Sequence, residues 1–130
     1  MGFAADIRDL LSTGGFADAP VFGGDLPERP VAAVCVTQTP RQGSQHTFGN
    51  TVGAPALEYL GFQIRVRAAD YAAADALMEA VHAKLDGLRD KAMDGKQYHW
   101  IASSSSPYYL GPDEEQRPIF ACNYDVKRSP

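Results

Sequence analysis

The strongest constraint on this chain is a strand-like segment that runs directly into a helix-like one. Between residues 60 and 67, apolar residues alternate with glycine, glutamine and arginine, which is the period-2 pattern of a strand with one buried and one polar face. After Asp70, apolar residues instead recur every three or four positions. Asp70 is therefore expected to cap an amphipathic helix that ends near Arg89 or Lys91.

Weaker patterns predict the remaining elements. A helical spacing covers residues 4–11, and short apolar or alternating runs predict strands over residues 31–36, 98–102 and 119–126. Trp100 is expected in the core. Polar segments rich in glycine, serine and proline fill residues 16–30, 39–56 and 103–116, and these are predicted to be connections.

The order of these elements predicts an α+β fold (α-β-β-α-β-β). In this prediction, a four-stranded, mainly antiparallel sheet is covered by one long helix. A length of 130 residues without a recognisable linker predicts a single domain across residues 1–130.

Composition excludes several classes of function. The formal net charge is −4 and no block of basic residues occurs, so nucleic-acid binding through the phosphate backbone is not expected. No uninterrupted apolar run is long enough to span a bilayer. Charged residues at positions 6 and 8 interrupt the apolar stretch that a signal peptide needs, so we expect an intracellular product. Cys35 and Cys122 are expected to be reduced core thiols, with a disulfide between neighbouring strands as the alternative.

The sequence shows no catalytic or cofactor motif. His46, His82 and His99 match no zinc-ligand spacing. The serines at 103–106 could be drawn into a hydrolytic triad with His99 and Asp113, but small polar runs before a proline are typical of loops. We therefore predict no enzyme activity, no cofactor and no metal.

Charged residues on two segments indicate an interaction function. Arg65 and Arg67 share the polar face of the predicted strand, and residues 113–115 form an acidic turn. Opposite charges on separate surfaces suit head-to-tail association of identical copies. The alternative is ordinary surface charge, with an internal ion pair between Arg67 or Arg117 and an acidic residue.

Three sequence segments carry a family resemblance. Residues 62–71 (FQIRVRAADY) lead into an alanine-rich helix, residues 22–27 (FGGDLP) follow a short helix, and residues 107–114 (PYYLGPDE) precede Arg117 and a final strand beginning IFACNY. In this order and at these spacings, the segments resemble the minor capsid and tail-terminator proteins of long-tailed bacteriophages over nearly the whole chain. Residues 39–56 match no feature of that family.

The resemblance implies a structural virion protein at the junction of tail and neck, made in the host cytoplasm. Such a protein caps the finished tail tube, ends its polymerisation and forms a hexameric ring on which the head or neck proteins dock. The implied partners are further copies of the chain, the tail tube protein and a neck or head-completion protein. No membrane and no sequence-specific nucleic acid is implied, although DNA could pass through the ring. The matched segments supply these candidate interface residues: Arg65, Arg67, Asp113, Glu114 and Arg117.

Two other functions remain open on the sequence alone. A head-side connector or stopper protein of the neck would leave tail length unaffected. A small ligand-binding or enzymatic α+β domain would show a concave apolar pocket with perturbed titratable groups.

Overall fold

Two helices and seven strands make up the described part of the chain, which comprises residues 3–13, 20–24, 26–45, 57–93 and 95–129 of a computed structural model. The helices are α1 (Phe3–Thr13) and α2 (Tyr71–Leu85). The strands are β1 (Val21–Gly23), β2 (Ala33–Gln45), β3 (Leu57–Arg67), β4 (Leu88–Met93), β5 (Lys96–Ser103), β6 (Tyr108–Pro112) and β7 (Pro118–Ser129). Neither described helix has the length and apolar character that a membrane crossing requires.

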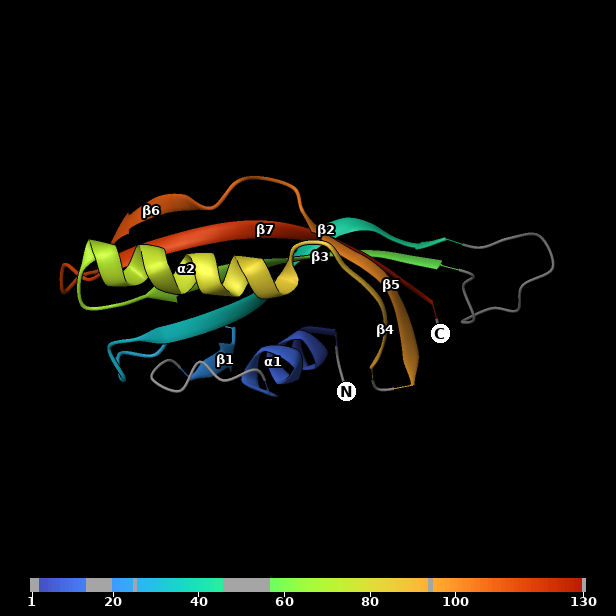
Figure 1. Ribbon diagram of the computed structural model, residues 1–130, viewed down its shortest axis with the longest axis horizontal. Helices are drawn as coiled ribbons and strands as arrows, with labels where there is room; N and C mark the ends of the chain where they lie inside the picture. The colour runs from blue at the N-terminus through green and yellow to red at the C-terminus, as the bar shows by residue number, and fades with distance from the viewer. Residues whose placement is uncertain (1–2, 14–19, 25, 46–56, 94, 130) are drawn as a thin grey trace.

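All seven strands belong to one sheet, in the order β1-β2-β3-β7-β5-β4, with β6 also paired to β7 (Figure 1). The β1–β2 pair is parallel and the other pairs are antiparallel. β7 is the central strand, because it pairs with β3 on one side and with both β6 and β5 on the other. This pairing places Arg67 of β3 opposite Ile119, next to Pro118, which pairs with Pro112 of β6. The end of β3 and the turn after β6 therefore meet beside the start of β7.

The core lies between the sheet and both helices. Phe62, Ile64 and Val66 are fully buried on one face of β3, which confirms the alternation predicted for this strand. The same core includes alternate residues of β7 and one face of each helix. The cap predicted for α2 is also confirmed, because the Asp70 carboxylate accepts a hydrogen bond of 2.8 Å from the backbone N–H of Ala73.

The predicted four-stranded sheet under one long helix is wrong. The sheet has seven strands, and two helices pack against it. α2 ends at Leu85 because Gly87 adopts a positive φ of 82°, a conformation that glycine accepts readily and that stops a helix. Residues 88–91, predicted as the end of that helix, belong to the edge strand β4 instead.

Two predicted connections also contain strands. β1 lies within residues 16–30, and β6 lies within residues 103–116. β2 continues to Gln45, well beyond the predicted end at residue 36, while residues 46–56 of the predicted long connection lie outside the described residues. Short edge strands such as β1 and β6 need no alternating apolar pattern, because neighbouring strands supply their hydrogen bonds.

A bulge in β5 removes Trp100 from the core. The register between β5 and β7 shifts between Tyr98 and Trp100, so Tyr98 and Ile101 face the core and are buried. Trp100 instead lies half-buried opposite Lys127, whose ammonium nitrogen is 5.4 Å from the centre of the indole ring. An extra residue in one strand reverses the faces of the residues that follow.

The two cysteines are buried and free. Cys35 pairs with Arg65 across β2 and β3, whereas Cys122 pairs with Ile64 across β7 and β3. Because Arg65 and Ile64 point to opposite faces of β3, the sheet separates the two thiols.

A buried polar cluster fixes α1 to the sheet. The Tyr98 hydroxyl donates a 2.7 Å hydrogen bond to the Asp6 carboxylate and accepts one of 3.0 Å from the Arg128 guanidinium. Arg128 also donates to both carboxylate oxygens of Glu58, at 3.1 and 3.3 Å. α1, β3, β5 and β7 are thereby joined through one network of charged groups.

Candidate functional site

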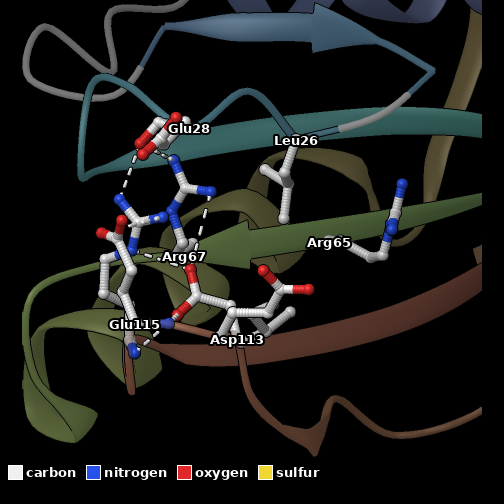
Figure 2. Close-up of a pocket in the computed structure, with 9 residues that line it drawn as sticks. Leu26, Glu28, Arg65, Arg67, Asp113 and Glu115 are labelled. Atoms are coloured by element: carbon white, nitrogen blue, oxygen red, sulfur yellow. Dashed lines mark hydrogen bonds and ion pairs between the residues drawn. The ribbon is translucent and has the colours of Figure 1, made fainter.

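All five predicted interface residues line one pocket, at the end of the sheet where β3, β7 and the turn after β6 meet. The pocket has a volume of about 510 Å³. Figure 2 shows that the Arg67 guanidinium lies between Glu28 and Asp113, whereas Arg65 lies apart from them. The residues that line the pocket are Leu26, Glu28, Arg65, Arg67, Asp113, Glu114, Glu115, Arg117 and Ile119.

Asp113 organises the turn that follows β6. Its Oδ1 accepts hydrogen bonds from the backbone N–H groups of Glu115 and Arg117, both at 2.9 Å, and its Oδ2 accepts one of 2.7 Å from Arg117 Nε. An aspartate that binds backbone groups two and four residues later is a typical turn residue. Partial burial raises the pKa of Asp113, but these hydrogen bonds lower it more, so its pKa lies below the ordinary value. The turn is therefore held by an ionised carboxylate.

Arg67 is a buried structural cation. Its side chain is 3% exposed, and it donates hydrogen bonds to the carbonyl oxygens of Val31 at 2.9 Å and Pro30 at 2.7 Å. Its guanidinium also lies 3.9 Å from Asp113 Oδ2. Burial lowers the pKa of Arg67, and the neighbouring Arg117 lowers it further. These contacts fix the segment before β2 to the end of β3.

Arg117 completes the network from the other side. Its guanidinium donates to the Glu28 carbonyl oxygen at 2.6 Å and lies 3.6 Å from the Glu115 carboxylate. The sequence left internal ion pairs as an alternative to surface charge. The structure contains such pairs, because both Arg67 and Arg117 are paired with the acidic turn. Arg67 and residues 113–115 form one joined cluster and not two separate surfaces.

Arg65 and Glu114 differ from these residues. The half-buried Arg65 donates to the carbonyl oxygen of Gly24 at 2.8 Å and lies 3.4 Å from the Cys35 sulfur. Glu114 is exposed. Among the described residues, no cation lies within ion-pair distance of its carboxylate. Of the five predicted residues, Glu114 is the one whose charge faces solvent.

The sequence interpretation did not choose the exposed aromatic residues at this end of the sheet as interface candidates. Tyr71 and Tyr109 are 57% and 45% exposed, and their rings contact each other with centroids 5.3 Å apart. Both rings also contact Phe120, at 5.0 and 5.4 Å. The two adjacent tyrosines before Leu110 are visible in the sequence, but the contact of Tyr109 with Tyr71 depends on the long-range pairing of β6 with β7.

The described residues do not assemble a catalytic triad from the predicted serines. His99 Nε2 lies 2.9 Å from the Ser129 hydroxyl, and Asp113 binds Arg117. Within the described parts of the chain, no three histidine, cysteine, aspartate or glutamate residues are grouped to hold a metal ion. What the site offers chemically is a set of charges and aromatic surfaces suited to protein contact.

Comparison with known proteins identifies a family and a shared fold. Residues 5–129 match the model of a protein family described as bacteriophage tail terminator protein. No curated protein is similar enough to match the chain. Among solved structures, a chain in the virion of a native gene transfer agent particle has a TM-score of 0.67 at 15% sequence identity, over 98% of this chain and 95% of that chain. At this identity the likeness concerns the fold.

Proposed function

This chain belongs to the bacteriophage tail terminator family, and we propose from this that it caps the tail tube, ends the polymerisation of the tube and forms the surface on which head or neck proteins dock. The observation that carries the proposal is the family match, which extends over residues 5–129. The resemblance of the residue 62–71 and 107–114 segments to tail-terminator proteins agrees with that match.

The proposed working form is a ring of six copies at the junction of tail and neck. Its partners are the last ring of tail tube protein on one side and a neck or head-completion protein on the other. The role is structural and not catalytic, and DNA passes through the ring without sequence-specific contacts. The exposed tyrosines at the same end of the sheet as the charged pocket support protein contact, because tyrosine and arginine are enriched at protein interfaces.

The five interface candidates divide into two roles in this proposal. Glu114 contacts a partner directly, since its side chain is exposed. Arg67, Asp113 and Arg117 hold the turn and the preceding segments in the shape that presents Glu114. Arg65 supports the neighbouring turn through the Gly24 carbonyl oxygen. Charge reversal at Arg67 would therefore disturb folding, whereas reversal at Glu114 would affect binding alone.

Tail length tests the function. A phage whose copy of this gene carries an early stop codon should produce overlong tails without heads, visible by electron microscopy. Adding the wild-type gene on a plasmid should restore tails of normal length. Tails of normal length that fail to join heads would contradict the capping function and would favour a head-side connector or stopper.

The mass of the purified protein tests the ring. Six copies of the 14.0-kDa chain weigh about 84 kDa, which sedimentation velocity separates clearly from a monomer. We expect a sixfold species to become dominant as the concentration rises. A dimer or trimer as the largest species at every concentration would contradict a hexamer.

A further inference from the structure

The exposed large hydrophobic side chains of the described residues gather at one end of the molecule. They are Val31, Tyr71, Tyr108, Tyr109 and Leu110. β6 and the start of α2, which carry four of them, lie together at the same end in Figure 1. The carbonyl oxygen of Val31 accepts a hydrogen bond from Arg67 at the end of β3. We call Tyr71, Tyr108, Tyr109 and Leu110, with Glu114 and Glu115 of the adjoining turn, the tyrosine end. Tyr71 and Tyr109 pack against the buried Phe120, and aromatic residues packed in this way are good anchors for a protein contact.

The acidic turn of the tyrosine end presents negative charge to solvent. Glu114 is exposed, and no cation among the described residues lies within ion-pair distance of its carboxylate. Glu115 is paired with Arg117 at 3.6 Å, but its side chain remains 57% exposed. Positive charge on a partner would therefore complement this turn.

The opposite end of the same chain supplies such a charge. Arg89 and Lys91 are exposed on the edge strand β4, and Lys96 follows at the start of β5. Among the described residues, no carboxylate lies within ion-pair distance of Arg89 or Lys91, whereas Lys96 lies 3.8 Å from Glu58. We call Arg89, Lys91 and Lys96 the basic hairpin. Figure 1 shows β4 and the start of β5 at the far end of the sheet from β6.

We propose that the tyrosine end of one copy binds the basic hairpin of the next copy, and that this contact builds the ring. The inference rests on the proposed function and names the surfaces that such a ring uses. Because the two surfaces lie at opposite ends, one copy engages two neighbours at once, which is the head-to-tail contact that closes into a ring. A two-fold contact of either surface with itself would instead bring like charges together.

Zero-length cross-linking tests the contact directly. Carbodiimide joins a lysine to a carboxylate only when the two groups touch. In a mixture of isotope-labelled and unlabelled full-length chains, we expect peptides that link Lys91 or Lys96 of one copy to Glu114 or Glu115 of another. Inter-chain peptides that exclude both surfaces, or none at the highest soluble concentration, would overturn the proposal.

Charge swapping tests the same contact by association. The Glu114→Lys/Glu115→Lys variant and the Arg89→Glu/Lys91→Glu variant should each associate at least about tenfold more weakly than the wild type, because like charges then face each other. Mixed in equal amounts, the two variants should recover association, since every contact is again between opposite charges. Glu79→Lys, an exposed substitution on α2 away from both surfaces, is the matched control and should associate as the wild type does.

A substitution at Asp90 tests the proposed contact by strengthening it. It is exposed between Arg89 and Lys91 and has a φ of 52°, which asparagine tolerates equally well. Asp90→Asn removes a negative charge from the basic hairpin and should strengthen association by a few fold. Weaker association of this variant, or no recovery in the mixture above, would contradict the inference.

These results separate the inference from the proposed function. Overlong tails in the phage without this chain, combined with cross-links at other surfaces, would leave the capping function standing and reject the contact. The expected cross-links combined with tails of normal length would support the contact and reject the capping function.

Discussion

Among single residues, Tyr98 should have the clearest effect on stability, because its hydroxyl lies between two buried charges of opposite sign. It donates to Asp6 and accepts from Arg128, while the second Asp6 oxygen is buried and has no hydrogen-bond partner among the described residues. We expect Tyr98→Phe to lower the free energy of unfolding by about 1–3 kcal/mol, because Asp6 then loses its neutral donor while it stays buried. Urea-induced unfolding followed by circular dichroism measures this.

Tyr108→Phe is the control for that substitution. The Tyr108 hydroxyl contacts Gln63 at 3.3 Å on an exposed part of the sheet, so its removal should change the free energy of unfolding very little. Equal effects of the two substitutions would show that the Asp6–Tyr98–Arg128 cluster has no special energetic importance.

Asp113 should make stability depend on pH. Its pKa is lowered in the folded state, so its contribution is fully present above the ordinary aspartate pKa of about 3.9 and is lost as the pH falls through the lowered value. The stability difference between wild type and Asp113→Asn should be constant near neutral pH and should shrink in acid below about pH 4. Chemical unfolding at a series of pH values measures it.

Arg117→Gln tests the cause of that pH dependence. The variant removes the 2.7 Å hydrogen bond from Arg117 Nε but leaves the backbone donors of the turn. The folded-state pKa of Asp113 should then lie closer to its ordinary value, so the pH-dependent loss of stability should be smaller than in the wild type and complete at a higher pH. An Asp113→Asn difference that stays unchanged from neutral to strongly acid pH would contradict the assignment.

At the scale of elements, the start of α2 depends on one side chain. Asp70 accepts a hydrogen bond from the Ala73 N–H at the first turn. We expect Asp70→Ala to lower the free energy of unfolding by about 0.5–2 kcal/mol, the usual effect of removing such a cap. Asp75→Ala, at an exposed position within the same helix, removes the same charge without a cap. A similar loss for both variants in thermal or urea unfolding would argue against capping.

The elements that the sequence predicts are those in which local pattern and burial agree. β3, β7, α1 and the start of α2 each bury one regular face, and that face is visible as a period in the sequence. β1, β4 and β6 lie at edges or beside the main path of the sheet, where exposed side chains show no period. The end of α2 was missed because Leu88 continues the helical spacing although Gly87 has already turned the chain.

The sequence predicted the individual residues of the candidate site but not how they contact one another. Arg67 and Asp113 are 46 positions apart in the sequence, and they meet because β3 and β6 both pair with β7. The sequence identified both residues as charged interaction candidates. It could not show that Arg67 is buried by the carbonyl groups of residues 30 and 31, because that contact depends on long-range strand pairing.

At the scale of the whole molecule, the separation of charge between the two ends predicts association that depends on salt. The contact between the tyrosine end and the basic hairpin should weaken as salt increases, because the screening length falls from about 10 Å at 0.1 M to about 3 Å at 1 M. Sedimentation velocity at both ionic strengths measures the effect. Association that strengthens with salt would indicate that apolar contacts between the tyrosine residues dominate the interface.

The cluster that fixes α1 also determines when this protein can fold during its synthesis. Asp6 leaves the ribosome early, but its partners Tyr98 and Arg128 emerge 92 and 122 positions later. The central strand β7 is likewise the last of the described elements along the chain. A chain still attached to the ribosome therefore lacks the middle of its own sheet, and contacts so distant in sequence form slowly. A chain that stops before Arg128 lacks the Asp6–Arg128 contact and the end of β7, and we expect it not to assemble.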